Sequence, residues 1–174
     1  MSATSDQRPR LTLVLGHAAS GKSAWAERAV TACPGPWTYV ATGAAGDGEM
    51  ADRIAAHAAR RGPGWRLTEE PLDLAGACAA ARGPVLVDCA TMWLSNLAMD
   101  GAAWDTRADD WIAAMRANPD SRFWVVSNDV GGGVVPANAM ARQFQRDQGM
   151  LNQRLAAAAD RVVLVTAGLP QVLK

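Results

Sequence analysis

Eight residues near the N-terminus form a pattern that is typical of phosphate-binding loops. Positions 16–23 read Gly-His-Ala-Ala-Ser-Gly-Lys-Ser, which fits G-x-x-x-x-G-K-[ST]. In such a loop the glycines let backbone N–H groups approach phosphate oxygens, the lysine reaches the terminal phosphates, and the last hydroxyl binds Mg²⁺. We therefore expect a nucleoside triphosphate here. The residues expected to bind it are Gly16, His17, Ala18, Ala19, Ser20, Gly21, Lys22 and Ser23, the last of which we also expect to bind Mg²⁺.

A carboxylate suited to the same metal follows an apolar run further along the chain. Val85-Leu86-Val87 leads directly into Asp88. An acid at the end of a strand is the usual partner of a phosphate loop in holding Mg²⁺. An apolar triplet followed by aspartate is common, so the functional interpretation of Asp88 depends on the phosphate loop being present.

A histidine among arginines forms a second candidate site. Helical spacing puts Arg53, His57, Arg60 and Arg61 close to one face of an alanine-rich stretch. They form either a solvated basic face with an incidental histidine, or a site where arginines hold a polyphosphate while the neutral imidazole attacks phosphorus. The residues alone leave both interpretations open.

Polar residues also follow a later apolar run. Asn128 and Asp129 precede three glycines, so they either position a substrate or simply form a turn. The residues after them are equally well explained by a surface helix or by a site. This second set is Arg142, Arg146, Asp147, Asn152 and Gln153.

Alternating strands and helices must position these groups. Short apolar runs at 11–15, 37–41, 85–87, 123–127 and 162–166 predict strands, and 24–32, 48–61, 72–81, 91–99, 104–117 and 138–159 predict helices, the last with Asn138 as N-cap. This order predicts an α/β fold with a mainly parallel sheet covered on both faces by helices. Ligands bind beyond the carboxyl ends of such strands, where the candidate residues then meet.

Composition sets the limits on this interpretation. The chain has 174 residues and a formal net charge of zero, which predicts one domain at 10–174 after a flexible leader at 1–9, and no general attraction to nucleic acid. No apolar run approaches the length of a membrane span, and the first nine residues lack the apolar segment of a secretory signal. Three scattered cysteines favour a reducing compartment over a disulfide framework or a zinc site, so we expect a cytoplasmic protein.

Over nearly its whole length the chain resembles the bifunctional adenosylcobinamide kinase and adenosylcobinamide-phosphate guanylyltransferase family of cobalamin synthesis (CobU/CobP). The matching segments, besides the phosphate loop, are Tyr39-Val40-Ala41-Thr42, Glu49-Met50, Arg53-Ile54 with His57, Trp65, Glu69-Glu70-Pro71, Asp88-Cys89 with Thr91, Trp93 to Asn96, Val126 to Asn128, Val130-Gly131, Val134 to Pro136, Arg146-Asp147, Gly149, Asn152-Gln153 and Gly168 to Lys174.

The resemblance implies a RecA-like phosphate-loop domain that works on three small molecules: adenosylcobinamide, ATP and GTP. It implies phosphorylation of adenosylcobinamide, then GMP transfer from GTP through a guanylylated histidine, which His57 matches. It also implies catalytic roles for Lys22 and Asp88, nucleotide contacts from Arg53, Arg60, Arg61 and Glu69, and assembly as an oligomer, typically a trimer.

Three departures from the family pattern weaken parts of this expectation. The family loop usually reads G-G-x-R-S-G-K-S, whereas His17 replaces the second glycine and Ala19 replaces the arginine. The usual glutamate after Asn128 is Asp129, one methylene shorter. Two alternatives therefore remain: a guanylyltransferase with weakened kinase activity, or a regulatory module that binds nucleotide without turnover.

Overall fold

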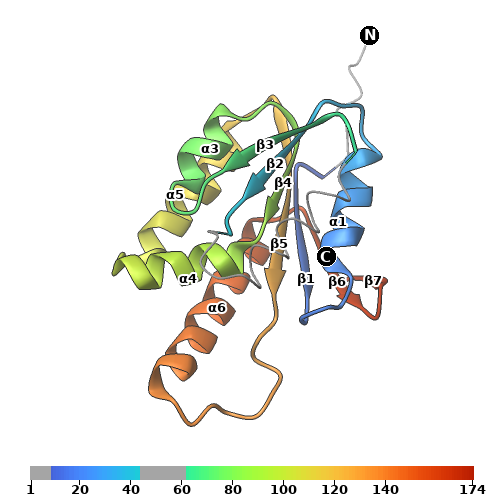
Figure 1. The fold of residues 1–174 in the computed structure, drawn as a ribbon. Coiled ribbons are helices and arrows are strands. Elements are labelled where there is room, and N and C mark those ends of the chain that lie inside the picture. The colour runs from blue at the N-terminus through green and yellow to red at the C-terminus, as the bar shows by residue number, and fades with distance from the viewer. Residues whose placement is uncertain (1–8, 44–61) are drawn as a thin grey trace.

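The computed structural model describes residues 9–43 and 62–174, which form a seven-stranded sheet flanked by helices (Figure 1). The strands lie in the order β3-β2-β4-β5-β1-β6-β7, and all are parallel except β7, which pairs antiparallel with β6. Their bounds are β1 Leu11–Gly16, β2 Trp37–Ala41, β3 Trp65–Glu69, β4 Gly83–Asp88, β5 Ser121–Asn128, β6 Arg161–Thr166 and β7 Leu169–Val172.

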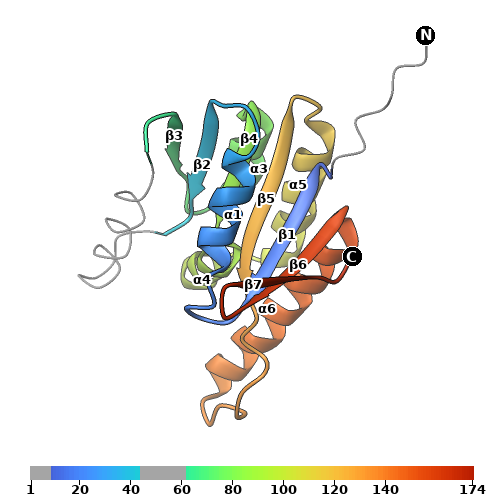
Figure 2. The same ribbon diagram turned by 90° about the vertical axis from the view of Figure 1, so that its right-hand side faces the viewer.

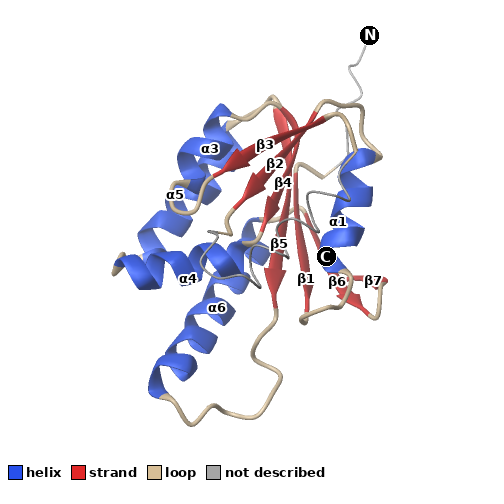
Figure 3. Cartoon of the chain, in the orientation of Figure 1, coloured by secondary structure: helices blue, strands red, loops and turns tan. Residues whose placement is uncertain are grey.

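Helices cover both faces of the sheet, as the alternating pattern predicted (Figure 2). Helix α1 packs on one face, and the other four described helices pack on the opposite face, where α6 extends well beyond the strand ends (Figure 3). The bounds are α1 Lys22–Thr31, α3 Leu74–Ala80, α4 Ala90–Asp100, α5 Trp104–Ala117 and α6 Ala139–Ala158. Within the described ranges, no helix is long and apolar enough to cross a membrane.

Strand alternation divides the interior into two apolar clusters. On β5, Phe123 and Val125 pack toward α3 to α6, whereas Trp124 and Val126 pack toward α1. Successive side chains of a strand point to opposite faces, so a strand buried on both faces reads as a continuous apolar run. This is why the central strands were visible in the sequence.

The five predicted strands are all present, and two edge strands were missed. β3 reads Trp-Arg-Leu-Thr-Glu and all of its residues except Trp65 are exposed, so it lacks the apolar run of a central strand. β7 is exposed at every residue and contains Pro170. Proline cannot donate a ladder hydrogen bond, so within sheets it is found mainly in edge strands. β7 is such a strand, because it pairs only with β6.

The predicted helices at 24–32, 72–81, 91–99, 104–117 and 138–159 are confirmed, with shifts of at most two residues at their ends. Asn138 caps α6 as expected, because its side chain accepts hydrogen bonds from the N–H groups of Met140 and Ala141. The predicted helix at 48–61 and most of the predicted leader at 1–9 lie outside the described residues.

Candidate functional site

The phosphate loop connects β1 to α1 in a closed, compact turn. Gly16 ends β1, the Ser20 N–H donates to the His17 carbonyl at 3.2 Å, and Gly21 enters α1 with a left-handed φ of 91°. A Cβ added at Gly16 would lie 2.3 Å from Ser20 Oγ and 2.6 Å from the Val165 carbonyl oxygen. Both glycines are therefore required by the shape of the loop itself.

Lys22 lies at the first turn of α1 with its ammonium folded over the loop. Its Nζ donates to the His17 carbonyl at 3.0 Å, and the residue is only 9% exposed. Burial lowers the pKa of Lys22, while the nearby Cys89 and Asp88 act in the opposite direction. A cation so placed suits an anionic ligand, and Ser23 follows it half-buried on the same turn.

The turn between β6 and β7 supports the loop from the C-terminal side. The Gly168 N–H donates to the Ser20 carbonyl at 2.8 Å, and a Cβ added at Gly21 would lie 3.1 Å from the Gly168 Cα. Ala167 and Gly168 both have positive φ, which is typical of a two-residue type I′ hairpin turn. The C-terminal hairpin thus contributes to the shape of the phosphate loop.

Asp88 ends β4, and neighbouring residues fix both its side chain and the backbone that follows it. The Tyr39 hydroxyl donates to Asp88 Oδ2 at 3.1 Å. The fully buried Thr42 hydroxyl donates to the Cys89 carbonyl and accepts from the Cys89 N–H, both at 2.7 Å. The peptide bond between Asp88 and Cys89 is cis. Burial raises the pKa of the Cys89 thiol to about 12, so this thiol is neutral at physiological pH.

These residues fit Mg²⁺, the metal expected from the sequence. Mg²⁺ is commonly held by one or two carboxylates or hydroxyls together with substrate phosphates and water, rather than by a cage of side chains. Asp88 and Ser23 offer those donors near Lys22. In the described part of the chain there is no cluster of three His, Cys, Asp or Glu side chains of the kind that binds transition metals.

Strand register brings Gly16, Asp88 and Asn128 to one edge of the sheet. Gly16 on β1 is paired with Asn128 on β5, and Asp88 on β4 is paired with Val126 on β5. Asp129 follows Asn128, and its N–H donates to the Gly16 carbonyl at 3.1 Å. The predicted meeting of these groups at the carboxyl edge is therefore observed.

The other candidates are less closely grouped. Glu69 also ends its strand, but β3 is four strands from β1, or about 19 Å at the usual strand spacing. The proposed nucleophile and its three arginines, Arg53, His57, Arg60 and Arg61, lie outside the described residues.

Comparison with known proteins identifies the family. The family model described as CobU, cobinamide kinase / cobinamide phosphate guanyltransferase, matches residues 12–173. The chain belongs to this family. It is 42% identical over 167 residues to the bifunctional adenosylcobalamin biosynthesis protein CobP of Pseudomonas aeruginosa, covering 93% of this chain and 96% of that protein. It is 39% identical over 182 residues to the protein CobU of Salmonella typhimurium, covering 94% and 99% of the two chains.

In this CobU-family chain, helix α6 carries two groups of polar side chains. One group bonds within or next to the helix, and the other reaches the candidate site. Arg142 donates to the Pro136 and Ala137 carbonyls, and Arg146 and Asp147 both bond to Gln143 on the same helix. These three residues therefore stabilise the helix locally. Asn152 instead donates to the Asn128 carbonyl at 3.0 Å, so it belongs to the site.

Residue-by-residue reasoning gave no role to four of the residues that shape the site. They are Tyr39, Thr42, Thr91 and Gln148. Each acts on a residue at least 21 positions away, so no local pattern marks it. The available signal was chemical: a buried polar residue at the end of a strand or on a core-facing helix position must find a partner.

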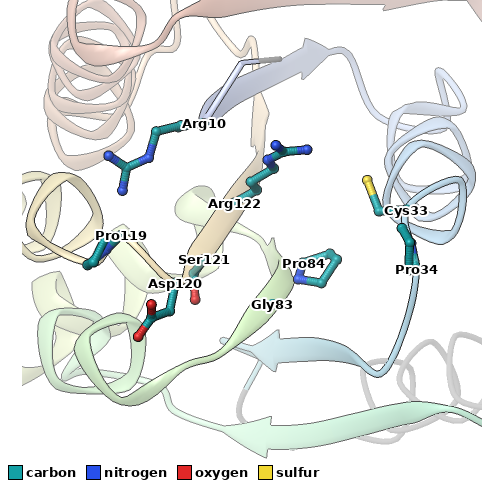
Figure 4. A pocket seen from close by; sticks show the side chains of 9 residues that line it. All are labelled: Arg10, Cys33, Pro34, Gly83, Pro84, Pro119, Asp120, Ser121 and Arg122. Atoms are coloured by element: carbon teal, nitrogen blue, oxygen red, sulfur yellow. The ribbon is translucent and has the colours of Figure 1, made fainter. Parts of the chain in front are cut away.

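A cavity of about 500 Å³ opens at the opposite end of the sheet, where β4 and β5 begin (Figure 4). The Arg10 guanidinium at its margin donates to the Asn118 carbonyl at 2.6 Å, and Asp120 lies 3.6 Å from Arg82. The charged groups are thus engaged in local contacts. Because the phosphate loop and Asp88 lie at the other ends of the strands, this cavity is separate from the candidate site.

Proposed function

We propose that this enzyme phosphorylates adenosylcobinamide and then transfers GMP from GTP to the product, giving adenosylcobinamide-GDP and pyrophosphate. Family membership over residues 12–173 supports the pair of activities. The observation that carries the proposal is the grouping of a phosphate loop, a buried lysine and a strand-end aspartate at one edge of the sheet.

In the kinase step, Lys22 and the loop amides hold the triphosphate of ATP or GTP. The acceptor hydroxyl oxygen attacks the γ-phosphorus, and the bond from that phosphorus to the β–γ bridging oxygen breaks. The nucleoside diphosphate leaves with the bonding electron pair, and the hydroxyl proton passes to solvent. Positioning and charge stabilisation account for most of the catalysis in such transfers.

Ser23 and Asp88 are the residues proposed to hold Mg²⁺. When bound, this ion neutralises charge on the phosphate oxygens. Tyr39 orients the Asp88 carboxylate through its hydroxyl, and Thr42 fixes the following peptide. The Lys22 ammonium has three donors, so we propose that it donates to phosphate oxygens when the nucleotide is bound.

In the guanylyltransferase step, a ring nitrogen of His57 attacks the α-phosphorus of GTP. The bond from the α-phosphorus to the α–β bridging oxygen breaks, and pyrophosphate leaves. A phosphate oxygen of adenosylcobinamide phosphate next attacks the same phosphorus and displaces the His57 nitrogen. Arg53, Arg60 and Arg61, together with Glu69, are proposed as nucleotide contacts in this step, and Asn128 and Asp129 as contacts to the acceptor.

Labelling tests the covalent step directly. GTP labelled at the α-phosphate should leave acid-labile label on the wild-type protein and none on His57→Ala, because a phosphoramidate forms only with the imidazole. GTP labelled at the γ-phosphate provides the control and should leave none. An unlabelled wild type, or equal labelling of His57→Ala, contradicts the mechanism. Assays with adenosylcobinamide and with its phosphate then measure the two activities separately.

We also propose a cytoplasmic homotrimer, the assembly implied by the family resemblance. Exposed apolar side chains are compatible with contact between copies, and the most exposed include Met99, Val134, Val135, Met140 and Leu169. Light scattering after size-exclusion chromatography measures the mass: three times 18.3 kDa supports a trimer, and 18.3 kDa excludes it.

A further inference from the structure

Side chains from two helices hold the backbone of Asn128. Its N–H donates to the Thr91 hydroxyl of α4 at 2.9 Å, and its carbonyl accepts from the Asn152 amide of α6 at 3.0 Å. The next N–H, at Asp129, donates to the Gly16 carbonyl of the phosphate loop at 3.1 Å. Three separate parts of the fold therefore hold the chain where β5 ends.

Asn152 is itself oriented by a buried network. Ser127 and Gln148 are both fully buried; the Ser127 hydroxyl donates to Asn152 Oδ1 at 2.6 Å, and Gln148 Nε2 donates to the same oxygen at 3.0 Å and to Ser127 Oγ at 2.9 Å. If the Asn152 side-chain amide were turned by 180°, its oxygen would face the Asn128 carbonyl oxygen, and two acceptors cannot form a hydrogen bond. The network thus permits one orientation of Asn152.

The network has a cost that stability alone does not explain. Gln148 Oε1 is buried and has no hydrogen-bond partner among the residues that the structure describes. Leaving a buried polar atom unpaired costs on the order of 1–3 kcal/mol. A leucine or methionine at this core-facing position would avoid that cost, which indicates that Gln148 serves to position other groups.

The Asn128 side chain remains available for a ligand. The side chain is half-buried, and its amide group makes no hydrogen bond within the described ranges. The bonds to Thr91 and Asn152 involve only the Asn128 backbone. Val126 and Leu86 belong to the apolar cluster on the α1 face, so alternation places Asn128 and Asp88 on that same face. This is the face of Lys22, where the terminal phosphates and the acceptor are expected to meet.

We propose that Gln148 and Asn152 are positioning residues, with Thr91, that fix the Asn128 amide against the phosphate-accepting group of the second substrate. This inference rests on the proposed function. Asn128 contacts the acceptor, whereas Gln148 and Asn152 act only through Asn128. An amide held in this way needs little reorganisation when substrate binds, which favours both binding and the correct line of attack.

The test compares Gln148→Met with Gln143→Met, an exposed position on the same helix whose side chain bonds to Arg146 and Asp147 of that helix. Gln148→Met should lower kcat/KM for the acceptor about ten-fold, as expected for loss of precise orientation, and leave the dissociation constant of nucleotide within about two-fold. Gln143→Met should match the wild type in both measurements. Unchanged kcat/KM in Gln148→Met, or an equal loss of nucleotide affinity, overturns the proposal.

Two further variant sets keep the test decisive. In an Asn128→Ala background, Gln148→Met should have no additional effect on acceptor kcat/KM, because its action passes through Asn128; additive losses contradict this. If Gln148→Met does not fold, Thr91→Val should show the same selective loss, and Thr91→Ser, which keeps the hydroxyl, should restore activity. Failure of the wild type to phosphorylate adenosylcobinamide would refute the proposed function rather than the positioning role.

Discussion

His17 Nδ1 lies 2.9 Å from the backbone carbonyl oxygen of Asp129 and joins the phosphate loop to the segment that follows β5. A carbonyl oxygen only accepts hydrogen bonds, so Nδ1 carries the proton in this contact. A Cβ added at Gly132 would lie 3.6 Å from the same imidazole ring. The loop that contains Gly132 therefore also lies close to the phosphate loop. His17, which stands where the family resemblance leads us to expect glycine, therefore links the phosphate loop to the segment proposed to contact the acceptor.

Replacing His17 by glycine should loosen this link. One lost hydrogen bond is worth about 1 kcal/mol, so the KM of the acceptor should rise about five-fold, and the backbone N–H groups of Val130 and Gly131 should exchange faster with deuterium. His17→Gln, which keeps a side-chain donor, should show a smaller change in both measurements. Identical exchange and identical KM in His17→Gly would contradict a linking role.

Two glycine substitutions should have opposite effects on stability. Gly16→Ala forces a methyl group to 2.6 Å from the Val165 carbonyl oxygen, so it should destabilise the fold by about 1–3 kcal/mol and abolish nucleotide binding. Gly149→Ala lies within α6, where an added Cβ has nothing within 4 Å, and should stabilise by up to about 1 kcal/mol. Thermal unfolding with and without nucleotide measures both; equal melting temperatures would contradict the assigned contacts.

The parts of the fold that were visible in the sequence are those encoded by neighbouring residues. The phosphate loop is contiguous, and the central strands carry their own apolar runs, so both could be placed without a structure. Thr42 and Cys89 are 47 positions apart, and their contact depends on the pairing of β2 with β4. Gln148 reaches Ser127 only because α6 docks beside β5. Such contacts depend on register and helix docking, which residue types along the chain do not specify.

Thr42→Val should be much more disruptive than its small change in volume suggests. The buried Thr42 hydroxyl accepts from the Cys89 N–H and donates to the Cys89 carbonyl, and valine can do neither. The carbonyl keeps a second donor, the Trp93 N–H at 3.2 Å, whereas the N–H loses its partner. One unpaired buried N–H should lower the free energy of unfolding by about 1–3 kcal/mol. It should also weaken Mg²⁺-dependent activity, because the neighbouring Asp88 loses its fixed backbone.

Thr42→Ser provides the matched control, since it keeps the hydroxyl and removes only a methyl group. Its free energy of unfolding in urea should fall by about 1 kcal/mol. If the serine variant lost as much stability as the valine variant, the hydroxyl would contribute no more than the methyl group, which would contradict its proposed role.

The buried Cys78 thiol should make the protein less stable as the pH rises above 9. Burial is the main reason that the pKa of Cys78 is raised from 9.0 to about 12; hydrogen bonding from Trp111 opposes this shift and Asp73 adds to it. Between these values the folded chain keeps a proton that the unfolded chain has lost. The stability due to the neutral thiol is therefore complete below pH 9 and is lost progressively up to pH 12, by about 1 kcal/mol at pH 10.

Urea unfolding of Cys78→Ala between pH 8 and 10.5 isolates this contribution from general alkaline effects. The variant should be less stable than the wild type at pH 8, because a buried sulfur is missing, but its stability should decline less steeply with pH. Val85→Ala, another fully buried truncation, removes no titratable group and should lower stability by the same amount at every pH. Parallel pH profiles for Cys78→Ala and the wild type would mean that the folded thiol ionises as readily as the unfolded one, which is incompatible with its enclosure between α3 and Trp111 of α5.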